Sequence, residues 1–184
     1  GSRPGCGRWS RPSTGSGRVT VPSQGEVVLN PGGFCFAAEG TRIRTLLGSC
    51  ISITLWHPQR RIGGMCHYMN PSRSQPVGPH DLDGRYADEA IQLFGNALDR
   101  TGTRPQEYEV KMFGGGTQFS TAGGSALDVC RDNVTAGLHL LDRYGYTLSA
   151  RHLGGAGFRR VDLDLATGQV GLTYVRNHVD EGAA

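Results

Sequence analysis

Residues 43–69 read IRTLLGSCISITLWHPQRRIGGMCHYM, and this run decides the fold class. It contains three short segments that are mostly apolar or β-branched, which is typical of strands. These segments are 43–47, 51–56 and 62–69. The first two flank Gly48-Ser49-Cys50, where glycine allows the backbone to turn sharply. The run therefore predicts strands, with Cys50 beside a turn between two of them.

Outward from this run, the chain alternates further strands with two helices. The other expected strands are 26–30, 108–113, 146–153, 161–165 and 169–175, the last two joined by a tight turn at 166–168. Apolar residues at helical spacing predict one helix over 85–99 and a second from Cys130 through Leu141 that closes near Gly145. Asp88 and Glu89 are expected on the exposed side of the first helix. The fold class is therefore predicted to be α/β, a mixed sheet sandwich with two main helices.

The 184 residues suffice for one domain with a hydrophobic core and are too few for two large ones. Residues 1–24 are rich in Gly, Ser, Pro and Arg, and such a composition buries too little apolar surface to order the chain. A disordered tail is therefore predicted at 1–24, a domain at 25–178 and a short C-terminal tail at 179–184. No apolar run reaches the length of about 18 residues that spans a membrane, which argues against membrane insertion.

The charges and the cysteines bound the function. The formal net charge is +3, but four of the 19 basic residues are arginines within the first eighteen positions, which leaves fifteen against 16 acidic residues. The body of the chain therefore lacks the basic excess that binds nucleic acid. The five cysteines are an odd number without a C-x-x-C pair or a visible secretion signal, which predicts reduced thiols in the cytoplasm.

Cys50 is the first residue that could carry chemistry. Because it follows a glycine turn and precedes a strand, its thiol can be presented to solvent. Free backbone N–H groups at Gly48 and Ser49 could hold an oxyanion there. From this segment alone, the commoner role of a free cysteine, a small buried hydrophobic residue, is the favoured interpretation.

His67 and Thr45 complete a set that fits acyl chemistry. Side chains alternate along a strand, so one face carries Met65, His67 and Met69 and the other carries Cys66 and Tyr68. Taken singly, His67 is more often structural and Thr45 more often a β-former. Taken together, a thiolate attacks acyl groups, a histidine takes its proton near neutral pH, and a hydroxyl fixes the histidine tautomer. The spacing alone does not show that the three side chains meet.

Neither a cofactor nor a metal is expected. The segment Gly114-Gly115-Gly116-Thr117 lacks the Lys-Ser/Thr ending of a P-loop. The histidines show none of the spacings of metal ligands, such as H-E-x-x-H.

Two segments resemble the signature of the CheD family, bacterial enzymes that deamidate glutamines of chemoreceptors. They are Thr45-Leu46-Leu47-Gly48-Ser49-Cys50 and Gly63-Gly64-Met65-Cys66-His67-Tyr68-Met69-Asn70-Pro71. Further stretches similar to the family follow in the same order, namely 85–91, 111–116, 132–134, 153–155, 159–161 and 167–168, so the resemblance covers about residues 26–176. The chain departs from the family pattern at Asn70, at Phe158 and over 127–130, none of which touches the three candidate residues.

The resemblance implies a fold related to the catalytic domains of deamidating bacterial toxins. It implies that Cys50 is the nucleophile, His67 the general base and Thr45 the hydroxyl that orients His67. It also implies that the substrates are the cytoplasmic domains of methyl-accepting chemoreceptors, with a CheC-type phosphatase as a further partner. Two rivals remain: a non-catalytic adaptor that binds such a phosphatase or receptors, and a thiol protease or amidase with other substrates.

Overall fold

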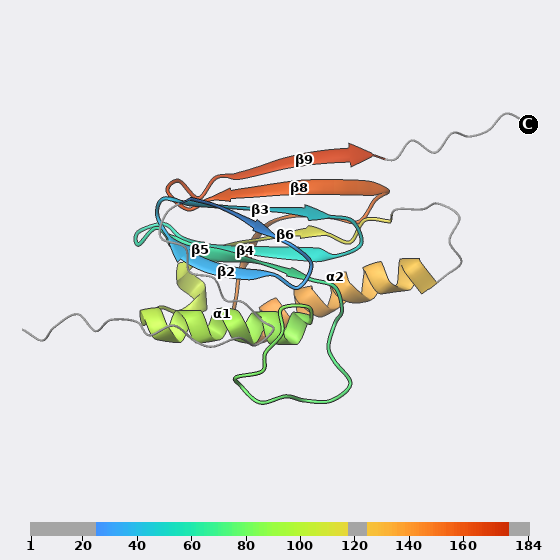
Figure 1. Ribbon diagram of the computed structural model, residues 1–184, viewed down its shortest axis with the longest axis horizontal. Helices are drawn as coiled ribbons and strands as arrows, with labels where there is room; N and C mark the ends of the chain where they lie inside the picture. The colour runs from blue at the N-terminus through green and yellow to red at the C-terminus, as the bar shows by residue number, and fades with distance from the viewer. Residues whose placement is uncertain (1–24, 118–124, 177–184) are drawn as a thin grey trace, which may run out of the picture.

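The chain folds into three layers, in which one sheet packs on a second sheet and the second sheet packs on two helices (Figure 1). The computed structural model describes residues 25–117 and 125–176. The tails expected at 1–24 and 179–184, and residues 118–124 of the expected glycine loop, lie outside the described residues.

Nine strands and two main helices make up the described part of the chain. The strands are β1 (Gly25–Leu29), β2 (Phe34–Ala38), β3 (Thr41–Leu47), β4 (Ile51–His57), β5 (Ile62–Tyr68), β6 (Glu109–Gly114), β7 (Leu148–Leu153), β8 (Gly157–Asp164) and β9 (Val170–Arg176). The helices are α1 (Ala87–Thr101), α2 (Ser125–Arg143) and the short 3-10 helix η1 (Pro105–Glu107).

Both sheets are mixed. The four-stranded sheet has the order β1-β3-β8-β9, with β1 and β3 parallel, and the five-stranded sheet has the order β2-β5-β4-β6-β7, with β6 and β7 parallel. The prediction of an α/β chain with mixed sheets and two main helices is confirmed. The run that decided the fold class supplies β4 and β5, which pair as neighbours, and β3, which lies in the other sheet.

Two hydrophobic cores hold the layers together. The first lies between the five-stranded sheet and the helices and includes Ile51, Ile53, Leu55, Tyr68 and Phe94, all almost fully buried. The second lies between the two sheets and includes Ile43, Leu47, Met65, Phe113 and Val161. The alternation predicted for β5 is therefore confirmed, because Met65 faces the other sheet while Cys66 and Tyr68 face the helices.

Glu89 corrects one expectation about α1. It was expected on the exposed side of the helix, but its side chain is buried. Arg73 donates two hydrogen bonds to its carboxylate, of 2.6 and 2.9 Å, and the backbone N–H of Asp83 donates a third. Charge-assisted partners satisfy the buried carboxylate, and they pin the segment after β5 to α1.

No helix in the described ranges is long and apolar enough to cross a membrane.

Candidate active site

The alternation of side chains along β4 and β5 places Cys50 and His67 on one face. Ser52 of β4 is the cross-strand partner of His67, and Ile51 is the partner of Tyr68. Ile51 packs toward the helices, whereas Cys50 packs against the core between the sheets. Cys50 is therefore diagonal to His67 on the same face, and such positions lie about 7–8 Å apart at their backbones. The two side chains that the sequence paired thus share one surface.

Residues 114–116, which we call the bracing segment, pack against the turn that carries Cys50. The N–H of Gly115 donates to the carbonyl of Cys50, and the N–H of Gly116 donates to the carbonyl of Gly48, each over 2.9 Å. Gly114 has φ of 120°, and a Cβ there would lie 2.1 Å from the carbonyl oxygen of Cys50, so only glycine fits this close approach. The N–H groups of Gly48 and Ser49 donate no backbone hydrogen bond within the described part of the chain.

Thr45 and His67 meet across the gap between the two sheets. Thr45 Oγ1 lies 2.8 Å from His67 Nδ1 and 2.9 Å from the carbonyl oxygen of Leu29. A threonine hydroxyl has one proton, and Leu29 O can only accept, so the hydroxyl donates to Leu29 and accepts from His67 Nδ1–H. This network assigns the imidazole proton to Nδ1 and leaves the lone pair on Nε2. Nε2 is buried and has no hydrogen-bond partner among the described residues.

Burial sets the resting protonation of the pair. It raises the pKa of the Cys50 thiol, an effect that a hydrogen bond with the Ser49 side chain offsets in part. Burial also lowers the pKa of His67 to about 4. Both shifts favour the neutral form, because desolvation penalises charge. Near neutral pH the site therefore rests as thiol and imidazole rather than as a thiolate–imidazolium pair.

Other polar groups near Cys50 were not singled out from the sequence. Ser52 is fully buried beside His67, and its hydroxyl has no partner among the described residues. Cys130 of α2 lies at the bracing segment, with its thiol 3.6 Å from the carbonyl of Gly116. Arg159 of β8 is buried between the sheets. Period-2 spacing from Cys50 could have indicated Ser52, whereas Cys130 and Arg159 reach the site only through tertiary contacts.

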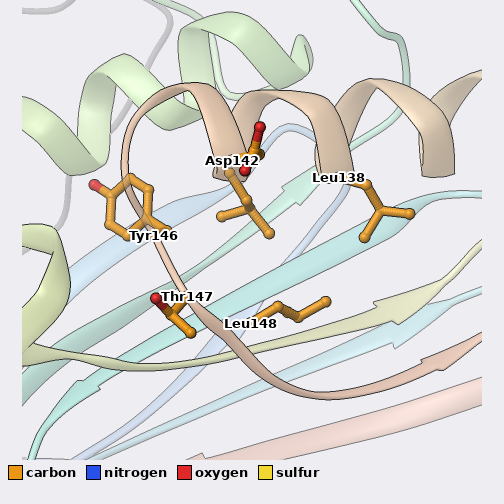
Figure 2. Close-up of a pocket in the computed structure, with 6 residues that line it drawn as sticks. Leu138, Asp142, Tyr146, Thr147 and Leu148 are labelled. Atoms are coloured by element: carbon orange, nitrogen blue, oxygen red, sulfur yellow. The ribbon is translucent and has the colours of Figure 1, made fainter.

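A shallow groove opens next to the bracing segment. It has a volume of ≈ 560 Å³ and is lined by residues of α2, of the 115–117 segment and of the turn after β7, among them Cys130, Val134, Leu153 and Ala156. A smaller hollow of ≈ 280 Å³ lies at the C-terminal part of α2 (Figure 2). No cysteine or histidine lines it. Within the described ranges, no three His, Cys, Asp or Glu side chains are grouped so that they could hold a metal ion.

Comparison with known proteins gives one consistent family. A family model described as CheD chemotactic sensory transduction matches residues 69–174. A protein of Dechloromonas aromatica (strain RCB) named "Probable chemoreceptor glutamine deamidase CheD 3" is 47% identical over 149 residues, which cover 81% of this chain and 87% of that protein. One of Pseudomonas fluorescens (strain SBW25), "Probable chemoreceptor glutamine deamidase CheD", is 48% identical over 151 residues, which cover 81% and 84% of the two chains.

Among solved structures, the hypothetical protein YfiH of Bacillus licheniformis aligns with a TM-score of 0.40 and 11% identity. The alignment covers 67% of this chain and 49% of that one.

Proposed function

The chain belongs to the CheD family, and on that premise we propose that it is a chemoreceptor glutamine deamidase. It converts glutamine side chains of receptors to glutamate and releases ammonia. One observation carries the assignment of the site. The Thr45 hydroxyl donates to the carbonyl of Leu29 and accepts from Nδ1–H of His67. Nε2 of His67 is therefore unprotonated, on the face that also holds Cys50.

The first half of the proposed reaction forms a thioester. As the Cys50 sulfur attacks the carbon of the substrate carboxamide, its proton passes to Nε2 of His67. The carbonyl oxygen gains negative charge, and the N–H groups of Gly48 and Ser49 supply donors for it. The carbon–nitrogen bond then breaks, and the proton on Nε2 goes to the leaving nitrogen, which departs as ammonia.

The second half restores the thiol. Nε2 of His67 takes a proton from a water molecule, whose oxygen attacks the thioester carbon. The carbon–sulfur bond breaks, the sulfur regains the proton, and the substrate side chain leaves as glutamate. Throughout both halves, the bond from Nδ1 to Thr45 holds the ring orientation and stabilises the imidazolium that forms transiently.

The resting state explains why the reaction would wait for its substrate. Thiol and imidazole are both neutral near pH 7, because burial raises one pKa and lowers the other. Proton transfer from Cys50 to His67 is therefore coupled to attack on a bound amide rather than completed beforehand. Such a thiol reacts slowly with small electrophiles, since the thiolate is the nucleophilic form.

The decisive experiment measures ammonia release from a purified receptor cytoplasmic fragment, with mass spectrometry to locate each glutamine converted to glutamate. The wild type should release ammonia, and Cys50→Ala should release none while keeping its fold. Cys66→Ala is the matched control, because its thiol lies on the paired strand β5 but faces the helices. Activity that survives in Cys50→Ala would remove Cys50 from the mechanism.

Two rival functions give different results in the same assay. An adaptor that binds receptors or a CheC-type phosphatase would release no ammonia from any receptor fragment. A thiol protease would yield shortened peptides rather than full-length receptor with glutamate in place of glutamine. Ammonia release without cleavage therefore separates the deamidase from both.

Four finer statements complete the proposal. The deamidase domain is residues 25–178, it acts in the cytoplasm on receptor cytoplasmic domains, and it binds a CheC-type phosphatase. The sandwich is also related to the catalytic domains of deamidating toxins, an idea supported by a cysteine just before β4 and a histidine on the neighbouring strand β5. Co-purification with a CheC-type protein tests the partner, and absence of binding with both proteins folded would remove it.

A further inference from the structure

Arg159 is a buried cation at the same end of the sandwich as Cys50. Its side chain is 1% exposed, and it lies on the face of β8 that points between the two sheets. Its neighbour Arg160 points outward, is exposed and pairs with Asp162. Arg159 pairs with no carboxylate in the part of the chain that the structure describes.

Among the described residues, the hydrogen-bond acceptors and the aromatic ring that contact the Arg159 guanidinium carry no negative charge. Its Nε donates to His152 Nδ1 over 2.8 Å, its Nη2 donates to the carbonyl of Gly154, and the group lies 4.5 Å from the ring centre of Tyr174. Its Nη1 is buried and has no partner among the described residues. Burial lowers the pKa of the guanidinium, but an arginine keeps its charge inside a protein. A buried charge without a counter-charge is costly, so its retention calls for a compensating role.

Nη1 lies close to Gly116, which is hydrogen-bonded to the turn that holds Cys50. A Cβ at Gly116 would lie 2.9 Å from Arg159 Nη1 and 3.4 Å from the carbonyl oxygen of Gly48. The N–H of Gly116 donates to that same carbonyl, and Cys50 follows two residues later. The charge therefore lies beside the glycine segment that is hydrogen-bonded to the Gly48-Ser49-Cys50 turn.

Arg159 and His67 flank Cys50 from opposite sides. In the five-stranded sheet, β5 with His67 lies on one side of β4, and β6 and β7, with His152, lie on the other. In the facing sheet, Thr45 of β3 bonds to His67, and Arg159 of the adjacent β8 bonds to His152. Each contact uses a histidine Nδ1 to join the two sheets, but only the Arg159 contact brings a positive charge.

We infer that Arg159 is a positioning residue whose buried charge favours the negative charge that forms at Cys50, an inference that rests on the proposed function. During attack on an amide, negative charge develops on sulfur as its proton leaves and then passes to the carbonyl oxygen. A fixed positive charge in a poorly solvated interior stabilises both without rearrangement of solvent. Arg159 contacts no substrate in this scheme, so its effect falls on kcat rather than on KM.

The test compares Arg159→Gln with Arg159→Lys by the rate at which iodoacetamide alkylates Cys50, measured by peptide mass spectrometry from pH 6 to 11. Gln keeps hydrogen-bond donors but no charge, whereas Lys keeps the charge but not the planar fork. Arg159→Gln should raise the midpoint of alkylation by about one pH unit, which corresponds to the loss of about 1.4 kcal/mol of charge stabilisation. Arg159→Lys should stay near the wild-type midpoint.

Matched measurements separate this inference from the proposed function. Arg160→Gln, one residue along β8 on the outer face, should leave the midpoint unchanged, and thermal melting verifies that each variant is folded. With a receptor fragment, Arg159→Gln should lower kcat about tenfold with little change in KM. If the wild type deamidates and a folded Arg159→Gln protein keeps the wild-type midpoint, the inference fails alone. If the midpoint shifts but the wild type releases no ammonia, the proposed function fails alone.

Should Arg159→Gln not fold, Arg159→Lys carries the test. A folded lysine variant whose midpoint rises by the full unit would show that the fork rather than the charge matters, and would overturn the inference. A wild-type midpoint in that variant supports it.

Discussion

The two faces of β4 divide the work of the protein. Ile51, Ile53 and Leu55 face the helices and belong to an apolar core, whereas Cys50 and Ser52, on the alternate positions, face the other sheet. Between the sheets the core also holds the polar contacts of Thr45 with His67 and of Arg159 with His152. One strand thus stabilises the fold with one set of residues and carries the candidate chemistry with the other.

The two faces differ in how well their buried polar atoms are hydrogen-bonded. On the helix face, Tyr68 is a buried polar residue, and its hydroxyl donates to the carbonyl of Asn133 over 2.7 Å. Four buried side-chain polar atoms have no partner among the described residues: Ser52 Oγ, His67 Nε2 and Arg159 Nη1 on the inter-sheet face, and Asn133 Oδ1 of α2 on the helix side. Unpaired buried polar atoms are destabilising, and in folded proteins they gather at functional sites. Three of the four such atoms lie on the inter-sheet face, which favours that face as the reactive one.

The largest effect is expected from His67→Asn. Loss of a general base typically lowers kcat by about 10²–10⁴-fold, and because His67 is buried and bonded to Thr45, the variant should also lose about 0.5–3 kcal/mol of stability. Ammonia release under saturating substrate and thermal melting of the same protein measure both. A His67→Asn enzyme that keeps wild-type kcat would show that the polar face is structural.

Ile53→Ala probes the opposite face and should reverse the pattern. Ile53 is 1% exposed, and removing a buried aliphatic side chain costs about 2–5 kcal/mol in the free energy of unfolding. Urea denaturation should reveal that loss, while kcat per folded molecule stays near wild type. A stable but inactive Ile53→Ala protein would contradict the division between the faces.

Acid should weaken the inter-sheet face through His67. Its pKa is about 4 in the folded chain and about 6.5 when unfolded, so the unfolded state binds the proton first as the pH falls. The contribution is fully present above pH ~6.5 and is lost progressively down to pH ~4, by about 3 kcal/mol in all. The free energy of unfolding measured at pH 7.5 and 4.5 should fall more in wild type than in His67→Asn. Equal losses would mean that the pKa of His67 is the same in the folded and unfolded chains, so that burial does not lower it.

The smallest effect is expected from Thr45→Val. The change leaves the buried Nδ1–H of His67 without an acceptor, which costs about 1–3 kcal/mol. If the transition state loses that much stabilisation of the imidazolium, kcat falls roughly tenfold to a hundredfold. Thr45→Ser keeps the hydroxyl and should remain within a few fold of wild type. If valine and serine behave alike, Thr45 does not fix the tautomer.

Much of this division could be read from the sequence because period 2 is a local property. Alternation assigned Met65 and His67 to one face and Cys66 and Tyr68 to the other, as the structure has them. β2, Phe34–Ala38, was not predicted, since a five-residue buried strand after a glycine turn offers little pattern. Glu89 was misplaced because its partner, Arg73, lies in a loop whose path depends on tertiary packing.

The candidate site was predicted only in part, for a similar reason. Cys50, His67 and Thr45 could be named from residue type and from resemblance, yet the contact of Thr45 with His67 depends on how two separate sheets face each other. No local pattern reports that packing. Arg159 was harder to predict, because it lies on β8, more than a hundred residues after Cys50 in the sequence.

The strand pairing in the sheet that contains Thr45 also affects how the chain folds during synthesis. β3 pairs with β8 across a sequence separation of about 118 residues, as in the contact of Arg44 with Asp162. Pairings this distant form slowly, because the intervening chain must first be closed into a loop. A ribosome releases β4 and β5 long before β8, so the nascent chain holds Cys50 and His67 before β3 has the neighbour that completes its sheet. Competence to react would then arrive late in synthesis, once nearly the whole chain is present.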